Sequence, residues 1–439
     1  MKTLTYEDLE KAFSEGAAAL RVRTRLHPAG GPNDKVFPPT FGDTVTVRDT
    51  DGREHRTRYA AEWRRVDGED RLCVLLDSVA SQANRFEEAL LHAYDQGELP
   101  IPMVRVDFTQ EHHEDVELDL STLGGDGYLT TLEAPHRLAD ALLRDSMLGD
   151  LRFRASEPGR AFSAADPHSA GAVFQLCPQA LVFGMWDSTG PQGGLGSKFQ
   201  RALSSEIVGI NVQFGRKTAS RLDPAGIEKQ AGPVFEAKDP ERVWTVNPDE
   251  AAMEKKKPKP FGGSGQTGGK PSSINHGNVT PSVDSEAGGV TLDYAEQTTV
   301  VSLPALRRLR FPKRLDGTLI PTEQRGEATR TAHVALASLA VTAIAMQRHE
   351  GYDLRSRCLF IPDGPLAIEI VGADGTASEP MTLDAAAGLA LTRQAADRTS
   401  AAGLPWNPTP VDLRPAPKLV DLIRRSRQQA AQGELAQDD

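Results

Sequence analysis

The residues from Leu20 to Leu26 alternate between two kinds of side chain. The even positions carry leucine, valine or threonine, and the odd positions are all arginines: Arg21, Arg23 and Arg25. A period of two predicts a β-strand with one buried and one exposed face. Three like charges on neighbouring same-side positions repel one another, so they need nearby acids or an anionic partner. The segment therefore predicts either a salt-bridged, solvated sheet face or a face that binds an anion, and we favour RNA.

A glycine-rich, basic stretch runs from Gly190 to Arg221. Four glycines fall within its first seven residues: Gly190, Gly193, Gly194 and Gly196. Five cations follow against one acid, Glu206: Lys198, Arg201, Arg216, Lys217 and Arg221. Glycines let the backbone approach a ligand and aim N–H groups at it. The segment carrying Lys198 and Arg201 is predicted to be a helix, and a helix N-terminus beside a lysine binds anions.

The order Gly196-Ser197-Lys198 differs from that of a nucleotide-binding P-loop, in which Gly-Lys-Ser/Thr follows four spacer residues. We therefore predict a cradle for backbone phosphates without a nucleotide-hydrolysis site. From this stretch alone, the alternative is a glycine-rich surface turn with solvated charges.

Composition limits the class of protein. The chain has 439 residues, enough for two or three domains with a sizeable core. A net charge of −11 argues against a protein that coats nucleic acid indiscriminately, so any such site must be a local basic strip. The three cysteines have no paired spacing, which excludes a disulfide framework or zinc knuckle and favours a reducing compartment. The N-terminal residues contain no apolar signal core, so we expect a cytoplasmic protein.

Strands and helices interleave without a regular βαβ repeat, which indicates an α+β fold. The run 71–79 is continuously apolar and predicts a central strand covered on both faces. The most apolar helix, 332–346, is too short to span a bilayer and predicts a buried core helix. The other predicted helices are 5–19, 81–97, 134–148, 166–177 and 418–429. The other predicted strands are 44–48, 54–65, 102–108, 180–186, 297–304 and 357–361.

Residues 249–289 differ in composition from the rest of the chain, because lysine, proline, glycine and serine dominate them. Such a segment cannot bury enough apolar surface to become ordered, so we predict a flexible, solvated loop. Its lysines from Lys255 to Lys259 offer an alternative role as a mobile arm that touches nucleic acid.

A convincing catalytic set is not visible in the sequence. The cluster from Glu111 to Asp115 lacks HExxH spacing and predicts a solvated charge run rather than a metal site. The chain contains no GxSxG nucleophile elbow. Asp77 and Ser78 end a buried strand before a helix, where functional groups tend to lie, but a helix-capping role is the preferred interpretation. We therefore predict no cofactor, no metal and no catalytic residue.

Three segments together resemble a known family: 19–41, 59–90 and 193–212, with SRLDP after the third. The chain resembles the backbone subunits of type I-U (also called I-G) CRISPR Cascade complexes, within the RAMP superfamily. The resemblance covers nearly the whole chain, including 132–146, and the segment DSVASQANR is its most diagnostic part. Residues 249–289 match nothing characteristic of the family.

The resemblance implies an RRM/ferredoxin-like palm with inserted finger and thumb elements. The palm would comprise residues 1–248 and 290–425, and residues 426–439 would form a polar tail. Such subunits are similar in lining up along one CRISPR RNA (crRNA) and leaving its bases free to pair. Phosphate contacts fix position without reading sequence, as a protein that serves many spacers requires. The chain lacks the aromatic pattern of ordinary RNA-recognition motifs, so base stacking on the sheet is not expected.

The predicted RNA-binding set combines the cationic positions, the glycine loop and the diagnostic segment. Its members are Arg21, Arg23, Arg25, Lys35, Gln82, Asn84, Arg85, Gly193, Gly194, Gly196, Lys198, Arg201, Arg216, Lys217 and Arg221. The partners implied are crRNA, target DNA through the guide, further copies of the chain, other Cascade subunits and the effector helicase-nuclease, with no membrane.

Two alternatives belong to other functional classes. Related RAMP subunits of type III complexes cut target RNA with an aspartate in the loop after the first strand, and Asp34 occupies a comparable loop. We prefer to interpret Asp34 as an Asx-turn residue or a partner of Lys35, because no second acid is nearby. The third hypothesis is a monomeric binding protein for a sugar or nucleotide phosphate.

Overall fold

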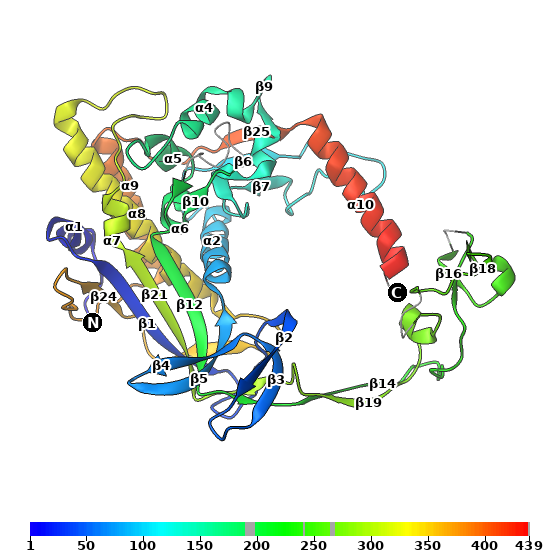
Figure 1. Cartoon of the computed structure of the whole chain (residues 1–439). Coiled ribbons are helices and arrows are strands. Elements are labelled where there is room, and N and C mark those ends of the chain that lie inside the picture. Colours follow the sequence, from blue (N-terminus) through cyan, green and yellow to red (C-terminus); the bar gives the residue numbers. More distant parts are fainter. Residues whose placement is uncertain (189–197, 240–241, 264–267, 438–439) are drawn as a thin grey trace. The chain divides into compact units, whose positions relative to one another are not determined.

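The computed structural model describes residues 1–188, 198–239, 242–263 and 268–437 (Figure 1). The chain divides into two compact units. The first unit comprises Met1–His112, Leu120–Gln213 and Gly289–Leu419. The second comprises His113–Asp119, Phe214–Gly288 and Val420–Asp439. The predicted boundary at residue 248 therefore falls inside the second unit.

An eight-stranded antiparallel sheet forms the centre of the first unit (Figure 1). Its strands lie in the order β22-β23-β1-β21-β12-β5-β4, and β24 also pairs with β1. Their bounds are β1 (Ala19–Pro28), β4 (Ala61–Val66), β5 (Glu69–Asp77), β12 (Leu203–Ile210), β21 (Tyr294–Ser302), β22 (Tyr352–Asp353), β23 (Leu359–Pro362) and β24 (Ile368–Val371). The alternating segment 20–26 thus forms a strand, as its period predicts.

Two helices are inserted between the strands of this sheet: α2 (Val79–Asp95) and α8 (Thr322–Glu350). The chain runs in the order β1, α2, β12, β21, α8, β24, and these strands lie side by side as β24-β1-β21-β12. All three neighbouring pairs are antiparallel. Interleaved helices and an antiparallel sheet confirm the α+β class.

One face of the sheet is buried, because Leu20, Val22 and Leu26 of β1 are buried there. Side chains of α2 and α8 bond to this face, through Gln82 to β12 and through Gln347 to β21. Helix α8 is long and apolar enough to cross a membrane, but 89% of its most apolar window is buried in the unit. The prediction of a buried core helix at 332–346 is confirmed.

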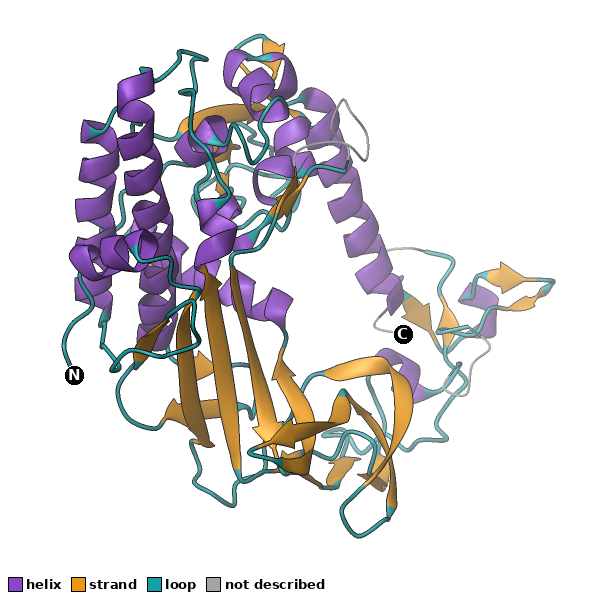
Figure 2. Ribbon diagram, turned by 60° about the vertical axis from the view of Figure 1, so that its left-hand side comes forward, coloured by secondary structure: helices purple, strands orange, loops and turns teal. Residues whose placement is uncertain are grey.

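Further helices complete the helical side of the first unit. Helix α9 (Ala385–Ala401) packs alongside α8, as Figure 2 shows. Helix α1 (Tyr6–Ser14) has the predicted capping box of Thr5 and Asp8, but it ends before residue 19, since Gly16 adopts a φ of 75°. The short helix α7 (Leu303–Arg307) follows β21 directly.

A second sheet of the first unit has the order β7-β6-β25-β8-β9. Its strands are β6 (Val104–Asp107), β7 (Tyr128–Thr130), β8 (Ser146–Leu148), β9 (Leu151–Arg152) and β25 (Val411–Pro415). Short elements nearby in the chain are η1 (Arg137–Ala139), α3 (Ala141–Arg144), η2 (Phe153–Ala155), α4 (Glu157–Ser163), α5 (Gly171–Leu176) and α6 (Gln179–Phe183). The remaining strands of the unit are β2 (Thr40–Arg48), β3 (Glu54–Tyr59), β10 (Met185–Trp186), β11 (Lys198–Phe199) and β20 (Val290–Thr291). Strand β13 (Gln213–Phe214) lies at the boundary, since Gln213 belongs to the first unit and Phe214 to the second.

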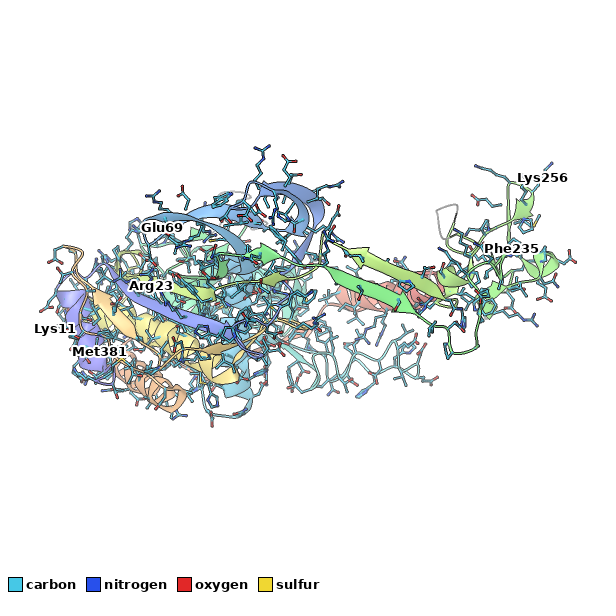
Figure 3. The ribbon with its side chains drawn as sticks, turned by 90° about the horizontal axis from the view of Figure 1, so that it is seen from below. Lys11, Arg23, Glu69, Phe235, Lys256 and Met381 are labelled. Atoms are coloured by element: carbon cyan, nitrogen blue, oxygen red, sulfur yellow. The ribbon has the colours of Figure 1, made fainter. Side chains whose placement is uncertain are left out.

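The second unit consists of short antiparallel pairs (Figure 3, Phe235 and Lys256). The pairs are β14 (Lys217–Arg221) with β19 (Val279–Asp284), β15 (Phe235–Glu236) with β16 (Trp244–Thr245), and β17 (Met253–Glu254) with β18 (Lys257–Pro258). It also contains η5 (Pro248–Glu250) and η6 (Pro271–Ile274). The predicted flexible loop 249–289 thus carries secondary structure in its described part. Helix α10 (Pro417–Gln437) extends through the predicted polar tail to Gln437.

Several predicted elements are wrong. The helix expected at 134–148 is split into η1, α3 and β8, because Arg137 has a φ of 51° and Asp140 starts a new helix as its cap. The strand expected at 180–186 is helix α6 followed by β10, since a short apolar run suits either element. The helix expected at 166–177 covers only α5. Strand β5 lies beside the edge strand rather than at the centre, although its residues 72–74 are all buried.

Candidate nucleic-acid interface

The three arginines of β1 lie on the face of the sheet opposite its buried residues. Acids of neighbouring strands pair with two of them: Arg21 Nε lies 2.8 Å from Glu369 Oε2, and Arg23 Nη2 lies 3.4 Å from Glu296 Oε1. The side chain of Arg23 remains 56% exposed (Figure 3). Neighbouring acids are therefore present within the fold for two of the three arginines, and Arg23 stays accessible.

The guanidinium of Arg25 takes a different partner. Its Cζ lies 4.4 Å from the centroid of the Tyr294 ring, a cation–π distance. This contact leaves the positive charge of Arg25 without a neutralising acid among the interactions of the described residues.

A small pocket of about 180 Å³ opens on the same face of the sheet. Its charged lining residues balance, because three arginines face three acids: Arg23, Arg64, Arg65, Asp67, Glu206 and Glu296. Arg64 Nη1 donates to Glu206 Oε1 at 2.6 Å, and this hydrogen bond raises the pKa of Arg64. An anion that binds here must compete with carboxylates of the protein itself.

The residues on either side of the glycine-rich stretch form a short two-strand ladder, in which β10 (Met185–Trp186) pairs with β11 (Lys198–Phe199). We call this ladder the neck. Gly193, Gly194 and Gly196 themselves lie outside the described residues. Met185 pairs with Phe199 and both are buried, whereas Trp186 pairs with Lys198 and both are exposed. Lys198 therefore lies in a strand, and the predicted anion site at a helix N-terminus is wrong. The reason is that Lys198 and Phe199 pair with β10, and the chain then enters the sheet strand β12.

A buried ion pair holds the base of this neck. Arg137 donates to both carboxylate oxygens of Glu87, at 2.7 and 2.6 Å, and to the Gly184 carbonyl at 2.8 Å. Burial raises the pKa of Glu87 to about 7, against the opposing charge of Arg137. The pair ties helix α2 to the residue that precedes β10.

Arg201, which is predicted to contact RNA, also bonds to the residues that precede β10. Its Nε donates to the Phe183 carbonyl at 3.1 Å, and burial lowers the pKa of its guanidinium. Gly184 packs against the backbone of Arg201 so closely that a Cβ at residue 184 would lie 2.8 Å from the backbone nitrogen of Arg201. A second buried pair, Arg154 with Asp187 at 2.6 Å, fixes the residue after Trp186.

The segment DSVASQANR is mainly structural. Ser78 caps helix α2 by accepting from Ser81 N at 3.2 Å, so the preferred capping interpretation is confirmed. Gln82 is fully buried and donates to Asp77 Oδ2 at 2.6 Å, while its Oε1 accepts from Gln297 at 2.7 Å. The prediction that Gln82 contacts RNA directly is therefore corrected: its polar atoms are used within the core. Asn84 is exposed on the same helix.

Arg85 bonds to the loop between β22 and β23, which lies near the C-terminal end of β1. It donates to Asp77 Oδ2 at 3.0 Å and to the Leu354 carbonyl at 2.6 Å. Arg357, in the same loop, lies 4.0 Å from the ring of Phe37, which belongs to the loop after β1. Lys35 Nζ lies 5.7 Å from the same ring. Lys35 and Arg85 thus lie at one end of β1, and Lys198 and Arg201 lie near its other end, where Ala19 pairs with Ser302.

The remaining predicted residues belong to the second unit. Lys217 Nζ pairs with Asp284 Oδ2 at 3.2 Å across the antiparallel pair of β14 and β19. Arg221 donates to the carbonyls of His276 and Gly277. Arg216 directly precedes β14. These three cations therefore belong to the second unit, whereas the other predicted cations belong to the first.

Residues 20–214 match the model of the family described as CRISPR-associated protein GSU0053 (Cas_GSU0053). The match indicates a CRISPR-associated protein family. Its range includes the β1 arginines, the DSVASQANR segment and the glycine-loop neck, and it ends before Arg216. A CRISPR-associated role implies interaction with other CRISPR components. No curated protein matches the chain.

A basic run after β21 was missed at the level of the sequence. Five cations and no acid occur between Leu303 and Leu315: Arg307, Arg308, Arg310, Lys313 and Arg314. Among the described residues, none of these five forms an ion pair within 4.0 Å; Arg308, for example, donates to the Gln200 amide oxygen at 2.5 Å. A count of charges along the chain reveals this run as readily as it reveals the β1 arginines.

Asp34 has a local backbone role. Its Oδ1 accepts from the backbone N–H of Lys35 at 2.9 Å, and its carboxylate packs over Gly30, where a Cβ would lie 2.3 Å from Oδ2. In the described ranges, no three His, Cys, Asp or Glu side chains group as a metal site requires.

Proposed function

We propose that the chain is a non-catalytic, crRNA-binding backbone subunit of a type I CRISPR Cascade surveillance complex, of the I-U/I-G type and the RAMP superfamily. Many copies line up along one guide RNA and present its bases to target DNA. The other Cascade subunits and the effector helicase-nuclease are its partners in the cytoplasm. The observation that carries the proposal is the exposed arginine row of β1, inside the part of the chain that matches a CRISPR-associated family.

The topology supports the palm in this proposal. The order β1, α2, β12, β21, α8, β24 is the β-α-β-β-α-β order of ferredoxin-like folds. The helices cover one face, so the opposite face, with the arginines, is available to RNA. The second unit is largely an insertion between β12 and β21 and is our candidate for the finger and thumb elements.

The charge distribution is consistent with sequence-independent binding. Arginine fits phosphate with the same planar fork that it offers to carboxylate, so a phosphate can take the place of Glu296 or Glu369. Phosphate contacts position a nucleic acid without reading its bases. Affinity should then fall steeply as salt rises.

The test is the mass of the protein with guide RNAs of two lengths, measured by light scattering after size exclusion. We expect multimers whose mass increases with the length of the RNA, and we expect Arg23→Glu with Arg25→Glu to abolish them. The matched control reverses Arg48 and Arg53, which lie on the β2–β3 hairpin and its turn. A chain that stays a single protomer with either RNA would overturn the proposal.

The enzyme hypothesis has a separate test. Because Asp34 acts on its own backbone, we propose that labelled complementary RNA stays intact when it is incubated with the assembled complex and Mg²⁺. Cleavage that disappears in Asp34→Ala would establish the alternative.

The phosphate-ligand hypothesis finds little support in a pocket of about 970 Å³ that opens between the N-terminal residues and residues 370–381. Its acids outnumber its bases: Asp8, Glu15, Asp374 and Glu379 against Lys2 and Lys11. Such a lining repels a small phosphate.

A further inference from the structure

Trp186 is a large aromatic side chain that the fold leaves on the surface. Its side chain is 55% exposed, whereas Met185, the other residue of β10, is buried. Burying an indole ordinarily stabilises a fold, so an exposed one beside a predicted nucleic-acid site suggests a binding role.

One cation lies over this indole, and a second lies beside the neck. Lys198 is directly opposite Trp186 in the two-strand ladder, and its Nζ lies 5.5 Å from the ring centroid. Gln200 directly follows β11 and is exposed. Its amide oxygen accepts from Arg308 at 2.5 Å, which brings that guanidinium beside the neck.

Lys198 and Arg308 differ in their partners from Arg21 and Arg23 of β1, which pair with acids. Within the described part of the chain, neither Lys198 nor Arg308 has a carboxylate within 4.0 Å. Their charges are therefore available to an external anion without displacing an acid of the protein.

The neck is held rigidly, which favours binding because little freedom is lost. The Arg154–Asp187 pair fixes the residue after Trp186, and the Glu87–Arg137 pair fixes Gly184 before β10. A preformed surface loses less conformational entropy when a ligand binds.

We propose that Trp186 is a stacking platform for one base of single-stranded RNA, and that Lys198 and Arg308 bind the phosphates on either side of that base. The inference rests on the proposed function, since RNA is the ligand, and it adds a base contact that lies off the sheet. Every base has a π-face, so stacking tolerates any guide sequence. An exposed cation–π contact at this distance is weak, so the Lys198 ammonium can turn to a phosphate when a base takes its place.

The experiment measures the binding of the full chain to a labelled, unstructured RNA over a range of salt concentrations. We expect Trp186→Ala to weaken binding about ten-fold, with an unchanged salt dependence, because stacking releases no counterions. Trp186→Phe should restore most of the affinity. Lys198→Ala with Arg308→Ala should make the negative slope of log K against log salt shallower by about 1.4, roughly 0.7 for each lost phosphate contact.

Two controls separate stacking from structural support. Trp63→Ala removes another exposed indole, on β4, and should leave binding unchanged. An RNA of equal length without bases should bind the unmodified chain and Trp186→Ala equally. If Trp186→Ala weakens binding to that RNA as well, Trp186 supports the neck and the inference is overturned.

The two proposals fail in different ways. If the unmodified chain binds RNA and Trp186→Ala binds it equally well, only the stacking platform is wrong. If the unmodified chain binds neither RNA, the proposed function and the platform are both wrong.

Discussion

The β1 arginine row and the β10–β11 neck carry similar charges but differ in how the fold treats them. In the row, Arg21 and Arg23 pair with Glu369 and Glu296, which lie on neighbouring strands of the same sheet. In the neck, Lys198 lies over an indole, and its support comes from ion pairs buried beneath it. Solvated pairs contribute little to stability, whereas a buried pair is costly to break. The difference teaches that a row of cations in a sequence indicates a charged surface but does not reveal whether its charge is already neutralised.

The largest expected effect tests the buried Glu87–Arg137 ion pair below the neck against an exposed pair of the β1 row. Glu87→Ala leaves the Arg137 guanidinium buried without its carboxylate, so we expect a loss of about 3–5 kcal/mol in the free energy of unfolding. Glu296→Ala breaks the exposed pair with Arg23 and should cost at most about 1 kcal/mol. Urea unfolding of the two variants measures both values. Equal losses would show that the neck is not more strongly anchored than the row.

The second prediction concerns the backbone at the same two regions. Gly184, before the neck, has a φ of 82° and leaves no space for a Cβ beside Arg201. We expect Gly184→Ala to cost about 2–3 kcal/mol, from strain and the clash together. Gly31, in the loop after β1, has a φ of 100° but open space around it, so Gly31→Ala should cost only about 1–2 kcal/mol. The measurement is again the unfolding free energy, and a larger loss for Gly31→Ala would contradict the assignment of the neck as the more tightly packed region.

Local patterns predicted those parts of both regions that depend on neighbouring residues in the chain. The period of two identified β1, the Ser78 cap identified the start of α2, and the apolar run identified the core helix at 332–346. These features arise within a few residues of each other, so a single sequence contains their cause.

Long-range pairing could not be predicted in the same way. Glu296 and Glu369 reach the β1 row only because β21 and β24 pair with β1, more than 270 residues further along the chain. Likewise, the segment with Lys198 and Arg201 was predicted to be a helix, because the pairing of β11 with β10 is not visible in a single sequence. The burial of Gln82 also follows from tertiary contacts, since its partners lie on three other elements.

A third prediction tests whether the acids of the row restrain its binding. Glu296→Gln with Glu369→Gln removes both competing carboxylates while keeping the size of the side chains. We expect RNA affinity to increase about three- to ten-fold, because each freed arginine gains a phosphate without losing an acid. The measurement is a binding titration at fixed salt, and Glu54→Gln on the β2–β3 hairpin is the control. Unchanged affinity would mean that RNA does not reach the row.

The smallest expected effect concerns the positive electrostatic potential of the basic run from Arg307 to Arg314. Burial, together with the charges of Arg310 and Arg307, lowers the pKa of His333 from 6.5 to about 4, against a hydrogen bond to the Leu309 carbonyl that raises it. Between these two values the unfolded chain binds a proton that the folded chain does not, so stability is fully present above pH 6.5 and is lost as the pH falls toward 4.

Cations without acid partners should act on such a group more than neutralised ones. Arg310→Ala should therefore raise the pKa of His333, by about a few tenths of a unit for a partly exposed charge, and reduce the loss of stability in acid. Arg21→Ala, which removes a neutralised cation, should leave this titration unchanged. The proton resonances of the His333 ring, followed from pH 7 to pH 4, measure both variants. A shift of equal size in both would show that the fold neutralises Arg310 as fully as it neutralises Arg21.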